Sequence, residues 1–422
     1  MGTSDMRVLI VAENASARFG GEAFLPIHYF QLLRSRNIET WLLTHARTQT
    51  ELETLFAEDR DRLYFMSDTW VHRLSWRLGQ PLPRRLGELT TGMVSHIHTE
   101  NIQRRIVRQL VREHKINIVH QPMPVSPKSP SLLFDVGAPV IIRPLNGGME
   151  FPPAFRSRQS RLEEVAIALV RHPQVSHFWN RILPGKLKAQ TLLVANERTK
   201  QALPSGVGGE VIKLAKNGVD LSVLQATAPL SKESNQTVRF VYLGRLIGWK
   251  AVDLLLESFK PVADQTDAVL EIIGDGPMRA ELEEQASQLD LGQNVVFTGW
   301  LSQEQCVLRL QHADALVLPS LWECGGAVVL EAMALGLPVI ATDWGGPADY
   351  VDSANGILIR PTSKPEFMNG LTDAMLKLVQ SPDLRQKMGS AGQERVRQQF
   401  DWERKVDRMI EIYQQTDAAW QT

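Results

Sequence analysis

The chain has 422 residues, of which 43% are hydrophobic and 22% charged, and its formal net charge is −1; this is the composition of an ordinary soluble protein that is too long for one hydrophobic core, so we expect two domains. Its two cysteines, Cys306 and Cys324, exclude a disulfide framework and a cysteine zinc site and fit a reducing cytosol. No apolar run reaches the length of a membrane-spanning helix, and the N-terminus lacks a signal-peptide pattern.

The N-terminal sequence predicts a strand, a glycine-containing turn, a helix and a second strand. The strands are expected at 7–12 and 39–44, and Gly20 and Gly21 precede the helix. This βαβ order is typical of a parallel, doubly wound sheet. Backbone N–H groups at such a helix start can bind an anion, although many ordinary helices begin with glycine. The three spaced glycines of a dinucleotide-binding loop are absent.

Residues 47–115 are rich in arginine, with Trp70, Trp76 and several leucines among the charges. The pattern predicts amphipathic helices, which either pack on the domain or lie on a membrane surface. No arrangement of basic and aromatic residues specifies nucleic acid. The segment Asp59-Arg60-Asp61 follows no buried strand, so we interpret it as surface rather than as a metal site.

Two further strands are expected at 116–120 and 138–143, each followed by a loop. His120 is expected at the carboxyl end of the first strand, where it either binds substrate or caps the strand. After the second strand, Asn146 can hydrogen-bond a ligand and Gly147 allows a close approach of backbone. The alternative is a tight turn, which Asn-Gly favours without any ligand.

Composition and charge indicate where the domains meet. The polar, aperiodic segment 224–236 is expected to link an N-terminal domain, 1–223, to a C-terminal domain, 237–398, with a final helix in 399–422. Residues 1–200 hold 27 Lys and Arg against 18 Asp and Glu, whereas the rest holds 19 against 29. A basic N-terminal half fits an anionic partner such as a membrane surface, and equally fits charge that serves solubility or domain docking.

The C-terminal half begins with a strand at 239–243 and a loop that carries Arg245 and Lys250. Two cations before a helix would clamp a diphosphate and stabilise the negative charge that develops on it. Exposed cations on an ordinary loop are the alternative. The next strand, 269–273, ends at Gly274, a turn expected at the same edge of the sheet.

The segment from Ala315 to Asp349 combines two carboxylates with two glycine pairs. Glu323 lies in a turn after the strand 315–318, and Gly325-Gly326 leads into a helix that carries Glu331 about two turns from its start. Backbone N–H groups at that helix start, including those of Ala327 and Val328, attract phosphate. Solvated glutamates on an ordinary crossover helix are the alternative, which suits one Glu better than the whole combination.

These motifs resemble the donor-site signature of retaining glycosyltransferases with the GT-B fold, glycosyltransferase family 4 (group 1). The resemblance covers nearly the whole chain and is strongest over 238–359. It implies two Rossmann-like, doubly wound domains facing a cleft, with a C-terminal helix that crosses back onto the N-terminal domain. It implies catalytic roles for Arg245, Lys250 and Glu323, donor binding by Glu331, Gly325, Gly326, Ala327, Val328, Gly274, Gly20 and Gly21, and an acceptor or sugar side at His120, Asn146 and Gly147.

The chain departs from the family pattern at two places. Many members carry a His near the transferred sugar, where this chain has Leu145 and Asn146. The residue after the family's Lys is usually Gly, and here it is Ala251. A role that depends on that His is therefore not implied for this chain.

The resemblance implies an enzyme that moves a hexose from a UDP- or GDP-sugar to a saccharide or lipid-linked acceptor, with retention of configuration and without a metal or other cofactor. We expect it in the cytoplasm, with peripheral contact to the inner face of a membrane as a further expectation. Two alternatives stay open: a nucleotide-sugar epimerase of the same two-domain fold, and a non-catalytic subunit that binds a sugar nucleotide.

Overall fold

The structure is a computed structural model that describes residues 5–19, 21–82, 87, 90–127, 129–158, 179–221 and 237–421. By its internal contacts the chain forms two compact units. The N-terminal unit consists of Met1–Gly148, Ser160–Lys216 and Val406–Thr422, and the C-terminal unit consists of Met149–Gln159 and Asn217–Lys405. The residue limits predicted for the domains stay a prediction, and the expected linker, 224–236, lies outside the described residues.

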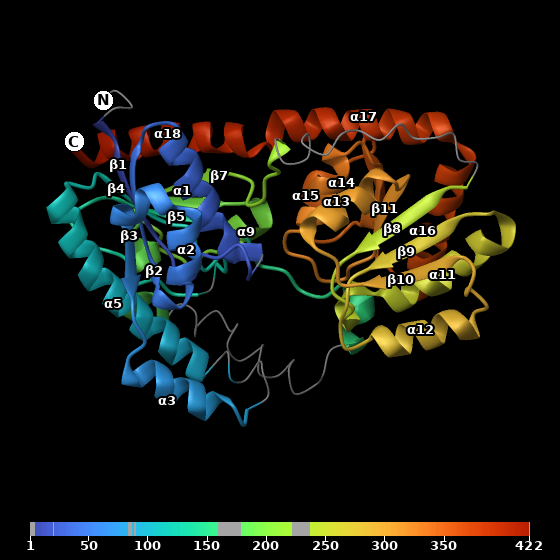
Figure 1. Ribbon diagram of the computed structural model, residues 1–422, viewed down its shortest axis with the longest axis horizontal. Helices are drawn as coiled ribbons and strands as arrows, with labels where there is room; N and C mark the ends of the chain where they lie inside the picture. Colours follow the sequence, from blue (N-terminus) through green and yellow to red (C-terminus); the bar gives the residue numbers. More distant parts are fainter. Residues whose placement is uncertain are drawn as a thin grey trace. The chain divides into compact units, whose positions relative to one another are not determined.

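The N-terminal unit is built on a parallel sheet (Figure 1). Its strand order is β3-β2-β1-β4-β5-β6-β7. The strands are β1 (Arg7–Val11), β2 (Glu39–His45), β3 (Leu63–Met66), β4 (Ile118–Gln121), β5 (Val140–Leu145), β6 (Thr191–Val194) and β7 (Glu210–Lys213). The chain leaves β1 for β2 on one side and later returns to β4 on the other. The topological switch point, where ligands bind in such sheets, therefore lies between β1 and β4.

Helices cover both faces of this sheet, as an α/β layer structure requires. α5, a 24-residue helix, packs through Val107, Leu110 and Val111 on the sheet face that includes Leu9 and Val119. The helices of the unit are η2 (Gly21–Phe24), α1 (Leu25–Ser35), η3 (Ala46–Thr48), α2 (Gln49–Leu55), η4 (Ala57–Arg62), α3 (Trp70–Gly79), α5 (Thr91–His114), α8 (Gly185–Lys188) and α9 (Glu197–Gln201).

The last helix of the chain, α18 (Trp402–Gln421), supplies a further layer to the N-terminal unit (Figure 1). The Tyr413 hydroxyl lies 2.7 Å from Nδ1 of His120, and the hydroxyls of Thr416 and Thr191 are 2.8 Å apart. These buried polar contacts place α18 against strands β4 and β6 of the same unit. A helix from the end of the sequence thus completes the N-terminal core.

The C-terminal unit contains a second parallel sheet, with strand order β10-β9-β8-β11-β12-β13. Its strands are β8 (Arg239–Leu243), β9 (Val269–Ile273), β10 (Val295–Gly299), β11 (Ala315–Leu318), β12 (Val339–Thr342) and β13 (Gly356–Ile359). Its helices are η5 (Pro153–Arg158), η6 (Gly248–Lys250), α11 (Val252–Gln265), α12 (Arg279–Gln288), α13 (Gln303–Gln311), α14 (Ala327–Ala334), α15 (Pro347–Tyr350), α16 (Lys364–Gln380) and α17 (Pro382–Gln399). The switch point lies between β8 and β11.

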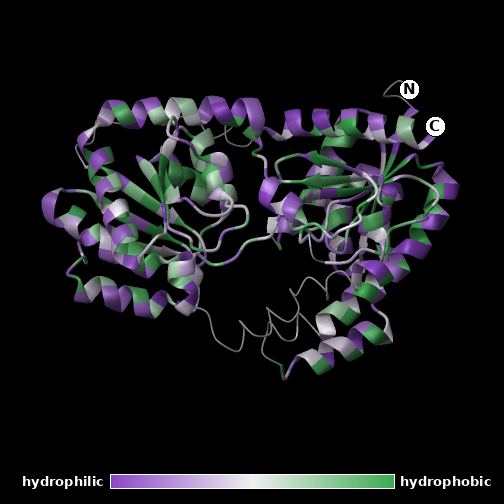
Figure 2. Cartoon of the chain, turned by 180° about the vertical axis from the view of Figure 1, so that it is seen from behind, coloured by the Kyte–Doolittle hydropathy of each residue, from purple (hydrophilic) through white to green (hydrophobic). Residues whose placement is uncertain are grey.

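Hydropathy explains both arrangements. Figure 2 shows the strands of each sheet as hydrophobic and most of the surrounding helices as striped with hydrophilic residues. Strands β11 and β12 are fully buried runs, ALVL and VIAT, as expected for parallel strands covered on both faces. None of the helices that the structure describes is long and apolar enough to span a bilayer.

Four local expectations need correction. The edge strand β3 was expected to be helical; it has four residues, too few for a strand pattern. Strand β5 extends to Leu145, two residues beyond the expected end. Strand β4 ends at Gln121, so His120 lies inside β4 rather than at its end. α14 begins at Ala327, which places Glu331 one turn rather than two from its start. The sequence also predicts a helix at 161–170, a prediction that lies outside the described residues.

Candidate functional site

The candidate site of the C-terminal unit lies in the loops after β8 and β11, at the switch point of its sheet. Strands β8 and β11 are parallel neighbours, with Phe240 paired to Ala315 and Val241 to Leu316. Both following loops therefore leave the same edge of the sheet. The first loop carries Arg245 and Lys250 and the second carries Glu323.

Glu323 joins the two loops through both of its carboxylate oxygens. Oε2 accepts a hydrogen bond from Nζ of Lys250, and Oε1 accepts one from the amide of Gly326 at 3.1 Å. The side chains of Lys250 and Glu323 are only 16% and 15% exposed, so water screens this ion pair less than it screens a surface pair. The structure therefore brings together a cation, a carboxylate and a glycine turn that the sequence predicted separately.

Arg245 lies on the same loop as Lys250 and is more exposed than this pair. Its side chain is exposed, and within the described residues its guanidinium has no hydrogen-bond or ion-pair partner. The Tyr242 hydroxyl donates to the carbonyl oxygen of Arg245 at 3.1 Å, which fixes the loop. Burial, and next the charge of Glu323, raise the pKa of Tyr242, so this hydroxyl keeps its proton. The guanidinium is thus free to meet an anion while its backbone is held.

The glycine turns let backbone segments approach where side chains would collide. Gly326 has φ +65° and directly precedes α14, and Gly345 has φ +75°. A Cβ on Gly345 would lie 2.4 Å from the carbonyl oxygen of Glu323, and the amide of Gly346 donates to that oxygen at 2.7 Å. A Cβ on Gly325 would lie 2.6 Å from Nδ2 of Asn217. The two turns are therefore packed against each other around Glu323.

α14 starts directly after Gly326 with Ala327 and Val328. Amides in the first turn of a helix have no acceptor within the helix, and the helix dipole adds a partial positive charge there. The exposed Ala327 and half-buried Val328 follow the Glu323 turn within five residues. Their amides can therefore add hydrogen bonds to an anion held near Lys250.

Glu331 lies one turn further along α14 and is half-buried. Because burial removes much of the water around the carboxyl, the pKa of Glu331 is raised. Burial, and next the charge of Glu331, raise the pKa of the neighbouring Cys306 thiol. Within the described residues the Glu331 carboxylate has no hydrogen-bond partner, so its oxygens can accept bonds from a ligand's hydroxyl groups.

Gly274 packs the loop after β9 onto the loop after β8. It has φ +136°, and a Cβ there would lie 2.0 Å from the carbonyl oxygen of Gly244. The amide of Gly244 donates to Ile273 O at 3.0 Å, and that of Gly274 donates to Gly299 O at 2.9 Å. Glycine is therefore required here by packing, and a role for Gly274 in ligand binding stays a prediction.

His120 lies in the core of the N-terminal unit, and substrate binding by this residue stays a prediction. Its side chain is fully buried, 4.7 Å by ring centroid from Tyr29, and its Nδ1 lies 2.7 Å from the Tyr413 hydroxyl. Successive side chains of a strand point to opposite faces of the sheet, and at this position of β4 the side chain points towards α1 and α18. It is a core residue that joins the last helix to the sheet.

The loop after β5 is also held within the N-terminal unit. The side chain of Asn146 is buried, with the residue only 3% exposed, and its backbone N–H donates to the carbonyl oxygen of Val125 at 2.8 Å. The amide of Gly147 donates to Oγ1 of Thr199 at 3.1 Å, and a Cβ on Gly147 would lie 2.4 Å from Cδ of Pro127. These contacts favour a packed turn, and ligand binding by Asn146 and Gly147 stays a prediction.

The glycine pair near the N-terminus is described only in part. Gly21 has φ +55° at the start of η2, and a Cβ there would meet no atom within 4 Å. The space around Gly21 is therefore open, which is compatible with a ligand. Gly20 lies outside the described residues.

The structure reveals a buried group of charged side chains that the sequence reading did not single out. Arg143, Lys186 and Glu100 are 0%, 0% and 3% exposed. One signal was available: Arg143 ends the run APVIIR, where a charge follows four apolar residues and a proline in a buried strand. Burial of Glu100 and Lys186 could not be predicted from the sequence, because neither lies in an apolar run that predicts a buried strand.

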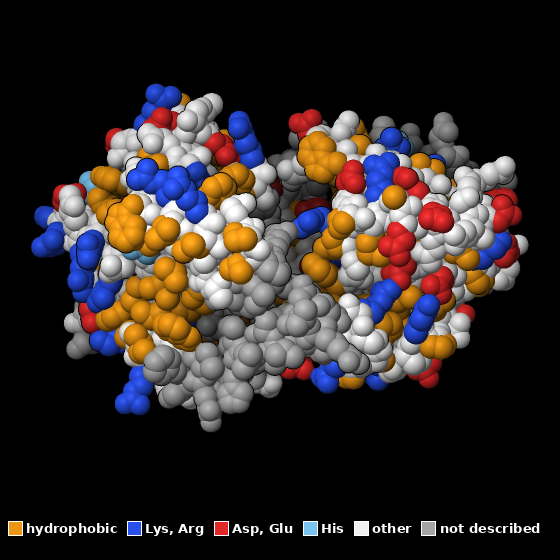
Figure 3. Space-filling model, turned by 90° about the horizontal axis from the view of Figure 1, so that it is seen from below, with side chains coloured by type: hydrophobic (Ala, Val, Ile, Leu, Met, Phe, Trp, Pro, Cys, Tyr) orange, Lys and Arg blue, Asp and Glu red, His pale blue; other side chains and the backbone are white. Residues whose placement is uncertain are grey.

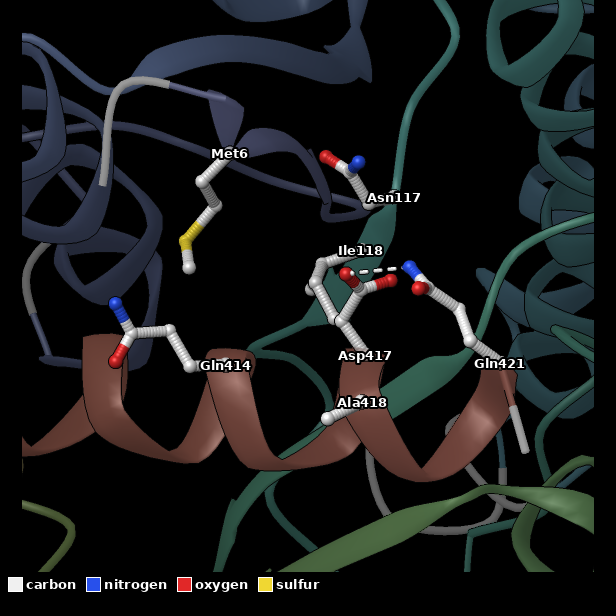
Figure 4. Close-up of a pocket in the computed structure, with 7 residues that line it drawn as sticks. All are labelled: Met6, Asn117, Ile118, Gln414, Asp417, Ala418 and Gln421. Atoms are coloured by element: carbon white, nitrogen blue, oxygen red, sulfur yellow. Dashed lines mark hydrogen bonds between the residues drawn. The ribbon is translucent and has the colours of Figure 1, made fainter. Parts of the chain in front are cut away.

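One pocket of the N-terminal unit lies away from these residues (Figure 4). It is found where the amino-terminal ends of β1 and β4 meet α18, opposite the carboxyl edge at which ligands bind in such sheets. Its lining residues are Met6, Asn117, Ile118, Gln414, Asp417, Ala418 and Gln421. Asp417 accepts a hydrogen bond from Gln421 at 3.0 Å, and we assign the pocket no function. Among the described residues, no group of three or more His, Cys, Asp or Glu side chains is placed to hold a metal ion.

Comparison with known proteins gives a family match over much of the C-terminal unit. Residues 229–395 match the family model described as glycosyl transferases group 1. A mannosyltransferase of Corynebacterium glutamicum, named GDP-mannose-dependent monoacylated alpha-(1-6)-phosphatidylinositol monomannoside mannosyltransferase, is 32% identical over 40% of this chain and 45% of its own length. The putative teichuronic acid biosynthesis glycosyltransferase TuaC of Bacillus subtilis is 28% identical over 57% of this chain and 62% of its own. The chain thus spans about half the length of these curated relatives.

Solved structures match the fold over almost the whole chain. A glycosyltransferase from Rickettsia africae aligns with a TM-score of 0.68 and 15% identity, covering 98% of this chain and 99% of the other. Anabaena HepE in complex with UDP aligns with a TM-score of 0.62 and 16% identity, covering 97% and 100%. At such identities the likeness establishes the two-domain GT-B fold.

Proposed function

Residues 229–395 belong to the group 1 glycosyl transferases, and the chain has the GT-B fold; from this premise we propose that the protein is a retaining glycosyltransferase. It moves a hexose from a UDP- or GDP-sugar to a saccharide or a lipid-linked acceptor. The C-terminal unit binds the donor, and the N-terminal unit binds the acceptor.

The observation that carries this proposal is the arrangement around Glu323. Lys250 pairs with its carboxylate, and on the same loop Arg245 carries an exposed guanidinium that has no partner within the described part of the chain. A diphosphate bound there would receive two charge-assisted contacts and the amides at the start of α14. Glu331 would hold the ribose hydroxyls, and Glu323 would bind hydroxyls of the sugar.

The chemistry follows from the same charges. As the bond between the sugar's anomeric carbon and the diphosphate breaks, negative charge grows on the leaving oxygen, and Arg245 and Lys250 stabilise it. The acceptor oxygen bonds to the anomeric carbon on the same face, and its proton passes to the leaving phosphate. This route keeps the configuration and needs no protein nucleophile. In our proposal these cations make a bound metal unnecessary.

The relatives support a nucleotide-sugar donor and leave its base open. The name of the C. glutamicum relative specifies GDP-mannose, and the Anabaena protein was solved with UDP and with UDP-glucose. A screen of UDP- and GDP-sugars, in buffer with EDTA, tests the proposal. A transferase should slowly release nucleoside diphosphate from one donor. An epimerase would instead convert the nucleotide sugar to its epimer, with no net release of nucleoside diphosphate. If every donor stays intact and unbound, the proposed function is wrong.

Helix α3 supports contact with a membrane, because its polarity is inverted. It buries His72 and Ser75, and Nε2 of His72 lies 3.0 Å from the hydroxyl of Thr99 on α5. Its large apolar side chains face outward instead: Trp70, Leu74, Trp76 and Leu78 are 69%, 47%, 67% and 57% exposed. Figure 3, which views the molecule from the side of α3, shows hydrophobic side chains gathered beside Lys and Arg on the N-terminal unit.

Two exposed arginines on the same helix, Arg73 and Arg77, favour an anionic partner for this surface. α3 has no acidic residue. Aromatic side chains insert at the boundary between headgroups and acyl chains, and neighbouring cations attract anionic lipid. We therefore propose that α3 docks on an anionic membrane, where a lipid-linked acceptor is found.

A further inference from the structure

Arg143 is the most unusual charged side chain of the N-terminal unit. It lies on β5 where the pairing with β6 shifts register between Ile142 and Pro144. Its side chain is fully buried, and Nε, Nη1 and Nη2 all lack a hydrogen-bond partner among the described residues. A guanidinium carries five N–H donors, and leaving them unsatisfied in the interior is costly.

The carboxylates nearest in electrostatic terms are already engaged. Glu22 and Glu100 both attract the Arg143 charge. Glu22 pairs with Lys216 at 3.1 Å. Glu100 accepts bonds from Nε2 of Gln121 and from the amide of Leu132, both at 2.6 Å. Burial lowers the pKa of Arg143 to about 9, which still leaves it charged at neutral pH.

Lys186, the other buried basic side chain of this group, has hydrogen-bond donors paired with backbone carbonyl oxygens. Its Nζ donates to the carbonyl oxygens of Ser126 and Pro127 at 2.8 and 2.7 Å. Among the described residues Arg143 makes no such bonds, although its charge acts on Lys186. The group therefore holds two buried basic side chains, and within the described part of the chain only Lys186 has hydrogen-bond acceptors.

Charge and geometry together favour an anionic occupant. The planar guanidinium fork binds the paired oxygens of a carboxylate or phosphate in two parallel hydrogen bonds. Arg143 lies near the carboxyl end of β5, and Glu22 follows the open turn at Gly21. Both belong to the edge of the sheet at which ligands bind in doubly wound folds.

We propose that Arg143 anchors an oxyanion subsite in the N-terminal unit, which takes a carboxylate or phosphate group carried by the acceptor. The subsite rests on the proposed function for the identity of its ligand as an acceptor. It adds a substrate class to that function: acceptors that carry an acidic group are bound, and neutral ones are bound poorly.

The test isolates this subsite from the donor site. The full-length double variant Arg245→Met/Lys250→Met loses the cations proposed to hold the donor diphosphate. At constant ionic strength, it is titrated with inorganic phosphate, with methyl glucuronide and with neutral methyl glucoside, while calorimetry and the melting temperature are recorded. Phosphate or the glucuronide should bind and raise the melting temperature, and the glucoside should not. The arm that responds identifies the group as phosphate or carboxylate.

Adding Arg143→Met should reduce this anion binding at least tenfold and should leave the ligand-free melting temperature equal or higher, because a buried unpaired cation is removed. Arg143→Lys, which keeps the charge without the fork, should bind between the two. Arg112→Met on the exposed end of α5 is the matched loss of one charge and should change nothing.

Two results would overturn the proposal. One is an absence of anion binding in the double variant, beyond the effect of salt. The other is equal binding with and without Arg143→Met. Donor binding by the wild-type protein is measured separately, so a protein that binds donor but no anion contradicts the subsite alone. If no donor binds, the proposed function is contradicted instead.

Discussion

The two units place their charged side chains differently. In the C-terminal unit, Arg245, Lys250 and Glu323 stand on loops at the sheet edge, either exposed or paired with each other. In the N-terminal unit, Arg143 and Lys186 lie wholly inside the protein. Loop residues can be recognised by spacing alone, whereas an interior charge is recognised only from its surroundings. The C-terminal unit thus carries a motif shared with a family, and the N-terminal unit carries features of this chain.

In our proposal, the donor site is therefore assembled before the ligand arrives. The Lys250–Glu323 pair and the Gly326 amide already form one bonded group. The buried Arg143 guanidinium has no protein partner among the described residues. The following variants test whether the two units differ in this way, in order of decreasing expected effect.

Lys250→Met should lower the rate of nucleoside diphosphate release by about 10²–10³-fold, because one charged donor to the leaving group is removed. The rate is measured at saturating donor. Lys260→Met, an exposed lysine position on α11, is the control and should stay within twofold of wild type. A Lys250→Met enzyme with wild-type turnover would remove the catalytic role from this loop.

Glu331→Ala should weaken donor binding by about 10–100-fold, since hydrogen bonds to a charged group contribute about 1.5–3 kcal/mol. Glu323→Ala should chiefly lower turnover. Calorimetric titration and steady-state rates separate the two effects. If both variants change affinity alone, the division of roles between the two carboxylates is wrong.

Trp70→Ser/Trp76→Ser should reduce partition onto vesicles with anionic lipid by at least about tenfold, because each indole contributes about 1.5–3 kcal/mol when its apolar surface is buried. Co-sedimentation measures the bound fraction. Trp300→Ser, at a 77% exposed position of the C-terminal unit, is the matched control and should not alter binding. Equal loss in both variants would show that α3 is not the docking surface.

His96 should make the stability of the N-terminal unit depend on pH. Its Nδ1 lies 3.2 Å from Oε2 of Glu13. Burial acts to lower the pKa of His96, but the bond to Glu13 and the charge of Glu100 outweigh burial and raise it. The imidazolium form therefore stabilises the fold below the ordinary histidine pKa, and this stability is lost as pH rises through the raised value.

The effect should be on the order of 1 kcal/mol, and urea unfolding between pH 6 and 9 measures it. Burial acts to raise the pKa of Glu13, but His96 and nearby cations lower it, so the Glu13 contribution persists down to acidic pH. His96→Gln should flatten the profile. A slope that is the same in this variant would assign the pH dependence to another group.

The smallest effect is expected at Ala251, which adopts φ +54° between η6 and α11. A left-handed conformation costs an L-residue with a side chain about 1–2 kcal/mol, and glycine avoids this cost. Glycine also makes the unfolded chain more flexible, which offsets part of that gain in stability. Ala251→Gly should therefore raise the free energy of unfolding by about 1 kcal/mol or less in a denaturant titration. A loss of stability would mean that the packing of the Ala251 methyl group outweighs the strain.

The sequence predicted sheet strands well where hydrophobic runs had clear boundaries. Strands β8, β9 and β11 lie at the expected residues. Short elements within the charged region 47–115 could not be placed, because the four residues of β3 are too few to show alternation. The resemblance to a family indicated the candidate site of the C-terminal unit, and the structure shows two of its residues, Lys250 and Glu323, in contact.

The N-terminal site could not be predicted in the same way. A polar residue near a strand end points either into the core or towards solvent, and a shift of one or two residues decides which. His120 was expected at the end of its strand, either to bind substrate or to cap the strand; β4 extends past it to Gln121, and its side chain is buried. Arg143 could not be recognised from the sequence. It has no partner among the described residues because nearby carboxylates are engaged by residues distant in the sequence, as Glu22 is by Lys216.

Calorimetric titration of the wild-type protein and of Arg245→Met/Lys250→Met with UDP-glucose and GDP-mannose tests the central claim most directly. We expect one of these donors to bind the wild-type protein in the presence of EDTA. The double variant should bind the same donor at least 100-fold more weakly while remaining folded. A wild-type protein that binds neither donor, or a double variant that binds as tightly as the wild type, would contradict a donor site at these loops.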